Sequence, residues 1–345
     1  MAFPKSHGSW ILIPLWLVVN SGFLACSPQD IEWRGHPEPD KRAALGIQDK
    51  HCQVLMEQAW DIYQIEDSIL ERASKKEEWE FNSDGQLVHY QKWQGAMRIQ
   101  ELRYKLNDRG QLVSTEDFEE EGQLKGASTI TYFADGQLAE IQRFNGRRRL
   151  KERCQYNYDD AGRIASIHNL FWREGEETPA GQDLHTYKYA SDDTYQIVTT
   201  IDERYERTEY YVAGHLDSIV NESGSKIKNH YNSNNQLVGE ESFDEAGNSS
   251  HKVEYIYDER GRQTLRVKYG NGRNSPSSTR TTYDSLGNVA SEEDRYNAGL
   301  SDERMETTLR EYRYTDYDSL GNWHTAAEQQ NGVLVRKRTR AFKPF

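Results

Sequence analysis

Residues that could do chemistry are common in this sequence, but they do not form a catalytic pattern. The ten histidines show neither a His-x-His pair nor the HExxH spacing that binds zinc. There is no GxSxG nucleophile elbow and no glycine-rich phosphate loop. Carboxylates occur throughout, which leaves a glycosidase pair open, but acids on recurring turns usually serve solvation and capping. We therefore predict a protein that is not an enzyme, with no catalytic residues and no cofactor.

Metal binding finds little support either. Asp-rich stretches such as 82–85 lack the further ligands and the distal glutamate of a calcium loop. Cys52 and Cys154 have no paired Cys/His spacing. Placed about seven strands apart in a meander, these two cysteines could meet only if the sheet curled strongly, so we interpret them as separate thiols. We predict no metal site.

The charge balance limits the class of partner. Lysine and arginine total 43 against 56 aspartate and glutamate, a net charge of −13. Such a surface repels phosphates, so we predict no nucleic-acid partner. A mean hydropathy of −0.95 is too polar for a polytopic membrane protein. Aromatic residues nevertheless make up 11%, too many for a disordered chain, so the apolar side chains must recur at particular positions.

One basic island interrupts the acidic chain around Asn145-Gly146. It could bind an acidic glycan or a partner carboxylate, or it could be a solvated strand face balanced by neighbouring acids. The candidate basic binding patch within it is Arg147, Arg148 and Arg149. A second basic run, at 336–340 in the last predicted strand, is interpreted as a device against edge-to-edge strand pairing.

The N-terminus has the features of an export signal. An apolar run over 10–19 is too short to span a bilayer but suits a signal-peptide core, giving a signal peptide over 1–25. Phe23-Leu24-Ala25-Cys26 resembles a bacterial lipobox, which makes Cys26 the predicted lipidation site and membrane anchor. Plain secretion and an uncleaved anchor are the alternatives. The proline-containing segment 26–50 is then a lipidated cysteine and tether.

The strongest signal is an internal repeat of 25 or 26 residues. Aligned on a turn glycine or its substitute, eight of nine units place an aromatic residue four positions earlier, and eight of nine place an apolar residue two positions later. Such a pattern predicts stacked hairpins with one buried face. The predicted core-face aromatics are Phe81, Tyr132, Tyr158, Tyr210, Tyr231, Tyr257, Tyr283 and Tyr317.

The turn chemistry explains the repeat. In several units an aspartate precedes the glycine by three positions, as expected when Asp caps a type I turn and Gly supplies a positive φ. Asp84-Gly85 and Asp135-Gly136 instead show the Asp-Gly pair typical of a tight hairpin. A second, weaker turn follows each first turn after ten to thirteen residues. The predicted repeat turn positions are Asp159, Gly162, Asp258, Gly261, Asp284, Gly287, Asp318 and Gly321.

These units resemble the RHS or YD-repeat family, whose motif is roughly Tyr-Asp-x-x-Gly-Arg-Leu. The segment 158–164 (YDDAGRI) matches it closely, followed by 257–262 (YDERGR) and 283–289 (YDSLGNV). The resemblance covers roughly residues 79–342. It implies a long coiling β-sheet, which the largest members wrap into a shell around a toxin. The sequence ends about two dozen residues after Gly321, so we expect a lipoprotein member without a C-terminal toxin.

The predicted fold is all-β: a long antiparallel meander of about 20 strands in one coiled or curled sheet. The repeat domain spans 79–345, preceded by an N-terminal cap region over 51–78. Within this cap we favour two strands with a turn near Lys75-Lys76 over a short helix.

Three functions of different classes remain. The first is a non-catalytic lipoprotein of the cell envelope, at the outer membrane or cell surface, which presents the sheet as a scaffold or adhesive surface for protein partners. The second is a surface protein that binds carbohydrate through exposed aromatic and acidic side chains. The third is an orphan toxin-shell or delivery-related fragment.

Overall fold

The computed structural model describes residues 52–65, 68–269, 277–297 and 305–344, all of which belong to the compact unit Trp33–Phe345. They form 22 antiparallel strands and one short 3-10 turn, η2 (Glu120–Gly122). The prediction of an all-β antiparallel meander is confirmed. Cys26, the signal segment and the tether lie outside the described residues. The strands are β1 (Cys52–Ile65), β2 (Ser68–Phe81), β3 (Leu87–Gln94), β4 (Met97–Leu106), β5 (Leu112–Phe118), β6 (Leu124–Tyr132), β7 (Leu138–Asn145), β8 (Leu150–Tyr158), β9 (Ile164–Phe171), β10 (Gly181–Tyr189), β11 (Tyr195–Ile201), β12 (Tyr205–Val212), β13 (His215–Asn221), β14 (Lys226–Tyr231), β15 (Leu237–Phe243), β16 (Ser249–Tyr257), β17 (Gln263–Tyr269), β18 (Ser277–Tyr283), β19 (Val289–Asn297), β20 (Met305–Tyr317), β21 (Trp323–Gln330) and β22 (Val333–Pro344).

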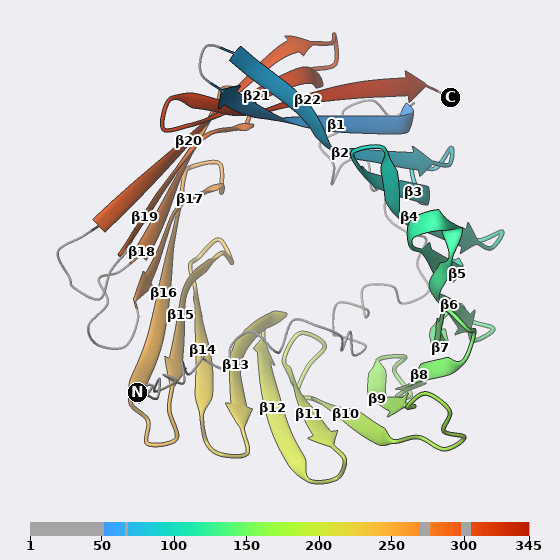
Figure 1. The fold of residues 1–345 in the computed structure, drawn as a ribbon. Helices are drawn as coiled ribbons and strands as arrows, with labels where there is room; N and C mark the ends of the chain where they lie inside the picture. The colour runs from blue at the N-terminus through green and yellow to red at the C-terminus, as the bar shows by residue number, and fades with distance from the viewer. Residues whose placement is uncertain (1–51, 66–67, 270–276, 298–304, 345) are drawn as a thin grey trace, which may run out of the picture. The chain divides into compact units, whose positions relative to one another are not determined.

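The sheet is closed, which corrects the expectation of a coiled or curled single sheet on this point. Each strand pairs with the next along the chain, and β1 also pairs with β22, from Cys52 opposite Pro344 to Asp61 opposite Arg336 (Figure 1). Closure removes both open edges, whose unpaired backbone groups would otherwise invite association. Twist that accumulates over so many strands brings the ends together.

Charged residues on β22 stabilise this closure. The Arg340 guanidinium lies 2.9 Å from the Glu57 carboxylate and 3.9 Å from the centre of the Trp323 ring. Arg336 pairs with Asp61 at 3.0 Å. Because β22 is paired on both sides, the interpretation of its basic run as protection of a free edge is wrong: the arginines join the two ends of the chain.

The N-terminal cap region is a hairpin of two 14-residue strands, in agreement with the prediction of strands rather than a helix. The predicted position of the turn is wrong. Lys75 and Lys76 lie inside β2, opposite Ala59 and Gln58 of β1. Local ion pairs to Glu77 and Glu78 and the packing of Lys76 against the Trp93 ring, at 4.3 Å, hold these lysines in the strand. A charged pair without glycine or proline does not by itself make a turn.

One face of the sheet carries most of the buried apolar and aromatic side chains, and we call it the aromatic face. Residues directly opposite in neighbouring strands share a face, so pairs such as Trp79 with Tyr90 and Tyr156 with Ile167 follow it around the sheet. Leu55, Phe81 and Cys52 form a buried cluster where the ring closes, packed against Phe342 of β22. The other cysteine considered above, Cys154, lies seven strands away on β8.

Seven of the eight predicted core-face aromatics lie on the aromatic face. Tyr210 is the exception, because it is 40% exposed and lies on the opposite face. Its neighbour Tyr211 takes the inner position and stacks on Tyr195 with ring centres 4.7 Å apart. The β12–β13 connection is only two residues long (213–214), so the position on the aromatic face lies three residues before the turn glycine here, whereas it lies four residues before it in the other units.

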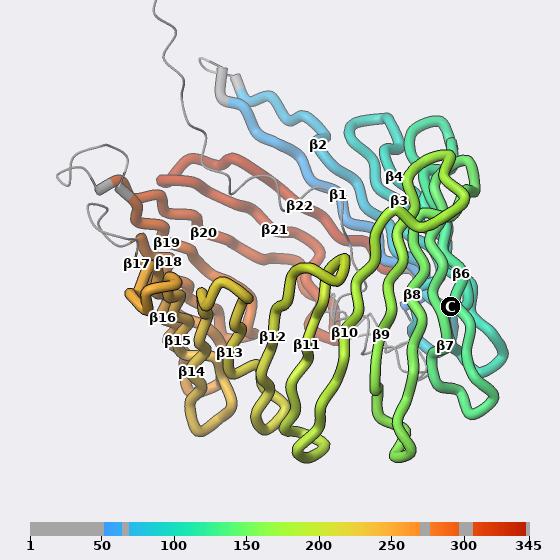
Figure 2. Tube along the Cα trace, turned by 90° about the horizontal axis from the view of Figure 1, so that it is seen from below, coloured from blue at the N-terminus to red at the C-terminus, as the bar shows by residue number. Residues whose placement is uncertain are grey.

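Because the meander is antiparallel, successive turns lie at opposite ends of the strands, and two rims result (Figure 2). The rim that begins with the β2–β3 turn contains the predicted Asp/Gly turns, and we call it the Asx rim. The rim that begins with the β1–β2 turn we call the variable rim. Nine of the ten connections on the Asx rim are five residues long, whereas those on the variable rim range from two residues (331–332) to nine (172–180).

Candidate functional site: a pocket on the variable rim

The Asx rim repeats one turn geometry at all the predicted turn positions. In the turn after β8, the Gly162 N–H donates to the Asp159 carbonyl at 2.9 Å, and the Asp159 carboxylate accepts the N–H groups of Ala161 and Arg163. Gly162 has a φ of +77°. These hydrogen bonds, with that from the Arg163 N–H first, lower the pKa of Asp159. The glycines of the two Asp-Gly pairs, Gly85 and Gly136, close the same five-residue turn from Asn82 and Phe133.

Two ladders of hydrogen bonds connect one repeat to the next. In the first ladder, the hydroxyl of the repeat tyrosine donates to a backbone carbonyl 20 residues earlier. In the second, a glutamine that directly follows the turn glycine or its substitute donates its side-chain N–H to the carbonyl of the next turn glycine. The donors of the first ladder are Tyr132, Tyr158, Tyr257 and Tyr283, and those of the second are Gln86, Gln111, Gln137 and Gln236. Sequence reasoning missed the glutamine ladder, although its signal is a Gln after the turn residue in four units. The Asx rim is thus locked by its own repeat chemistry.

The basic island lies on the variable rim, at the turn between β7 and β8, and acids balance most of it. Arg147 pairs with Glu174 at 2.6 Å and Arg148 with Glu116 at 2.8 Å. On the adjoining strands Arg143 pairs with Glu152, and Arg153 lies 3.6 Å from Glu140. Within the described residues, no carboxylate lies within ion-pair distance of Arg149 or Lys151.

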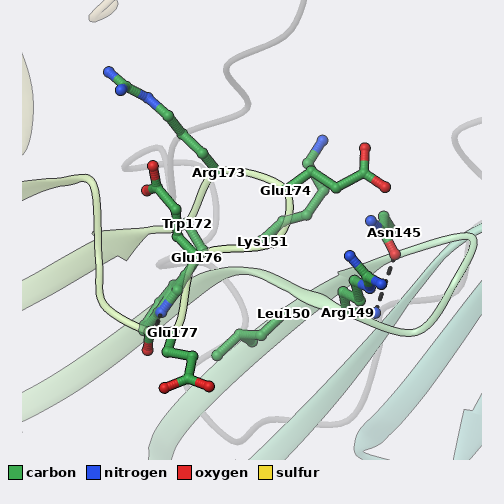
Figure 3. Close-up of a pocket in the computed structure, with 10 residues that line it drawn as sticks. Asn145, Arg149, Leu150, Lys151, Trp172, Arg173, Glu174, Glu176 and Glu177 are labelled. Carbon is green, nitrogen blue, oxygen red and sulfur yellow. Dashed lines mark hydrogen bonds between the residues drawn. The ribbon is translucent and has the colours of Figure 1, made fainter.

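Arg149 and Lys151 line a pocket of about 610 Å³ between the β7–β8 turn and the long β9–β10 loop. Figure 3 shows Arg149 beside Asn145 on one side, Leu150 and Lys151 in the middle, and Trp172, Glu176 and Glu177 on the other side. Of the three residues in the predicted basic patch, the structure brings only Arg149 to this pocket.

The wall opposite the basic turn comes from the loop 172–180, which the sequence analysis did not single out. Trp172 continues the pairing of β9, its N–H donating to the Lys151 carbonyl at 2.8 Å. Its indole N–H donates to the Glu177 carbonyl at 3.4 Å and so ties the loop to its base. Arg173 also lines the pocket. The available signal was the long spacing between turn residues after 163, which indicated an insertion without showing what it lines.

A second polar cluster lies on the aromatic face near the same rim. His185 of β10 contacts Asn169 at 3.1 Å and Thr199 at 2.8 Å, and burial lowers its pKa to about 4. Its neighbour Asp183 faces Asp202 and Glu152, and burial together with these acids raises its pKa to about 6. In these described strands the polar groups contact each other rather than an open pocket, so we assign them to packing.

The described residues contain no group of three or more histidine, cysteine, aspartate or glutamate side chains placed to hold a metal ion. Within them there is also no helix with the length and apolar character needed to cross a membrane.

No protein-family model and no curated protein matches the sequence. Among solved structures the chain is similar to TcdB2-TccC3-TEV, with 12% identity and a TM-score of 0.27 over 81% of this chain. It spans about a fifth of that chain, 19%. It is also similar to a porin-like protein from Bacteroides uniformis, with 11% identity and a TM-score of 0.28 over 85% of this chain and 98% of that chain.

Proposed function

We propose that this protein is a non-catalytic binding protein of the cell envelope, in which the closed repeat sheet is a rigid scaffold and the variable rim is the surface offered to protein partners. The observation that supports this most is the contrast between the rims. Connections on the Asx rim are uniform and bonded from repeat to repeat, whereas those on the variable rim differ in length and form the pocket. Binding residues are found preferentially on loops that a rigid scaffold positions.

The cellular address belongs to the same proposal. A signal peptide over 1–25 would direct export of the protein. Lipidation at Cys26 and a tether over 26–50 would then hold the sheet at the outer membrane or cell surface. The repeat motifs support membership of the RHS or YD-repeat family. Mass spectrometry of the mature N-terminus tests the address, because a lipidated Cys26 carries the mass of its acyl chains.

Site-specific photo-crosslinking in intact cells tests the binding proposal. A photoreactive amino acid at exposed Thr178 reports on the variable rim, and at exposed Leu286 or Leu320 on the Asx rim. We expect discrete crosslinked proteins from the variable rim and none from the Asx rim. Equal crosslinking from both rims, or none from either, would contradict the proposal.

A second candidate function is carbohydrate binding at the same pocket. It is favoured by Trp172, a half-buried aromatic side chain next to the cations Arg149 and Lys151 and the carboxylates Glu176 and Glu177. Aromatic faces stack on sugar rings while charged groups hold hydroxyls, so such a mixture suits a saccharide. A glycan array tests it: specific hits lost in Trp172→Ala support carbohydrate binding, and an array without hits eliminates it.

A further inference from the structure

We infer that the pocket between the β7–β8 turn and the β9–β10 loop binds the free C-terminus of an extended peptide from a protein partner, one that ends in an apolar residue and has a basic residue two or three positions upstream. This rests on the proposed function and specifies the chemistry of its partner.

The cations define an anion site. Of the six basic residues in the island, Arg143, Arg147, Arg148 and Arg153 face acids of the protein itself. Arg149 and Lys151 have no such partner among the described residues and line the pocket instead. An arginine can hold a carboxylate through two parallel N–H bonds, and a second cation nearby strengthens the site. Capture of a terminal carboxylate is a recurrent form of peptide recognition.

The apolar residues of the pocket provide a contact surface for a side chain next to the bound carboxylate. Leu150 stands between the two cations in sequence, and Trp172 is bonded through its backbone to Lys151. Both line the pocket. In a peptide C-terminus the last side chain and the carboxylate are attached to the same Cα, so the two groups reach neighbouring sites together. An isolated side-chain carboxylate brings no apolar group at that spacing.

The acids decide between a peptide and an acidic polysaccharide. Glu176 and Glu177 line the far wall, and Glu174 stands next to them in its pair with Arg147. A polyuronate carries a carboxylate on every sugar and would meet repulsion beyond its first residue, made worse by the net charge of −13. A peptide carries one terminal carboxylate, and an upstream lysine or arginine can pair with these glutamates.

The site is also partly organised in advance. The Arg147–Glu174 ion pair at 2.6 Å links the basic turn to the loop, and the Trp172 indole anchors the loop to the Glu177 carbonyl. A loop already held in place loses less conformational entropy on binding.

Fluorescence anisotropy with the full-length protein tests the inference. The probe is an N-terminally labelled hexapeptide, Gly-Ser-Lys-Ser-Gly-Leu with a free carboxylate. Matched probes are its C-terminal amide and a version with glutamate in place of lysine, and tetragalacturonate serves as a competitor. Protein variants are Arg149→Ala and Lys151→Ala, with Arg204→Ala as the control, since Arg204 is an exposed cation on the neighbouring β11–β12 turn of the same rim.

We expect the free acid to bind, the amide to bind about tenfold more weakly or worse, and each pocket variant to lose about tenfold in affinity, with no change in Arg204→Ala. The glutamate probe should bind severalfold more weakly than the lysine probe. Equal binding of acid and amide, or an equal loss in Arg204→Ala, would overturn the inference. Binding of tetragalacturonate without the peptide would overturn it in favour of a saccharide. Failure of every probe would overturn it too, whereas rim-specific crosslinks in cells would still support the proposed function.

Discussion

The two rims of the sheet are built from the same strands but follow different rules. On the Asx rim, a five-residue turn recurs, its aspartate or asparagine caps the backbone, and glutamine and tyrosine side chains bond to the adjoining repeat. On the variable rim, the connections range from two to nine residues, the capped five-residue turn occurs in only some of them, such as 244–248, and several of their charged side chains pair across hairpins. A closed sheet needs a constant spacing between strands, and one rim is sufficient to set it. The other rim is then free to vary, and the pocket lies there.

The largest expected effect comes from adding a methyl group to a turn glycine on each rim. Gly261→Ala places a Cβ 2.9 Å from the Gln236 amide nitrogen that donates to the Gly261 carbonyl, at a φ of +77°. We expect a loss of about 2–3 kcal/mol in unfolding free energy, from backbone strain plus a broken ladder bond. Gly175→Ala on the variable rim meets nothing within 4 Å at a φ of +90°, so only strain remains, about 1 kcal/mol. Urea denaturation measures the unfolding free energy of both variants. Equal losses in the two would mean that the hydrogen bond of the glutamine ladder contributes nothing to stability.

The pH dependence of stability should have opposite signs on the two rims. Asp183, near the variable rim, has a pKa raised to about 6, so its charged form destabilises the fold at neutral pH. Asp183→Asn should therefore raise the unfolding free energy by about 1 kcal/mol at pH 7.5, and this gain should shrink as the pH falls below 6 and vanish below about pH 4, where the wild-type carboxyl is protonated in both the folded and the unfolded state. Thermal melts across this range are the measurement.

The Asx aspartates provide the opposite case. The Arg262 side chain and N–H groups lower the pKa of Asp258, so its ionised form stabilises the fold at neutral pH, and this contribution is lost as the pH falls below the ordinary aspartate range. Asp258→Asn should lower the melting temperature at pH 7.5 and matter less in acid. If both variants shifted stability in the same direction at pH 7.5, the electrostatic contrast between the rims would be wrong.

Removing one hydroxyl from each rim should give a smaller difference. Tyr257→Phe deletes the bond to the Leu237 carbonyl at 2.7 Å, a half-buried contact between repeats, and should cost about 1 kcal/mol. Tyr205→Phe deletes an exposed bond to Asn221 at the variable rim and should cost less than about 0.5 kcal/mol. Chemical denaturation measures the unfolding free energy of both variants. A larger loss for Tyr205→Phe would mean that the variable rim, and not the Asx rim, is the one locked by side-chain hydrogen bonds.

The smallest effect on stability is expected at the pocket itself. Glu174→Gln breaks the Arg147–Glu174 pair, whose side chains are 75% and 57% exposed respectively, and should change the unfolding free energy by less than about 0.5 kcal/mol. A melting temperature more than a few degrees lower would show that this loop supports the sheet rather than the site.

Much of this architecture was predictable because its causes are local. The Asp-x-x-Gly turns, the alternating aromatic positions and the antiparallel meander all depend on residues a few positions apart. Some errors were local: the short β12–β13 turn moved Tyr210 off the aromatic face, and Lys75 and Lys76 continue a strand that pairs with β1. The larger error had a distant cause, because the arginines of β22 contact partners more than 270 residues earlier in the chain. The pocket was half predicted: Arg149 was named from its basic run, whereas Trp172 and Arg173 belong to an insertion without periodicity.

By itself the sequence determined the repeating hairpin, its capped turns and the face that carries the tyrosines, because these follow from backbone preferences and a two-residue period within about 26 residues. Only the tertiary structure decided that the sheet closes, that one end is locked while the other varies, and which two cations of the basic island have no acid partner in the described part of the chain. Those outcomes depend on twist summed over 22 strands and on charges brought together from distant parts of the chain.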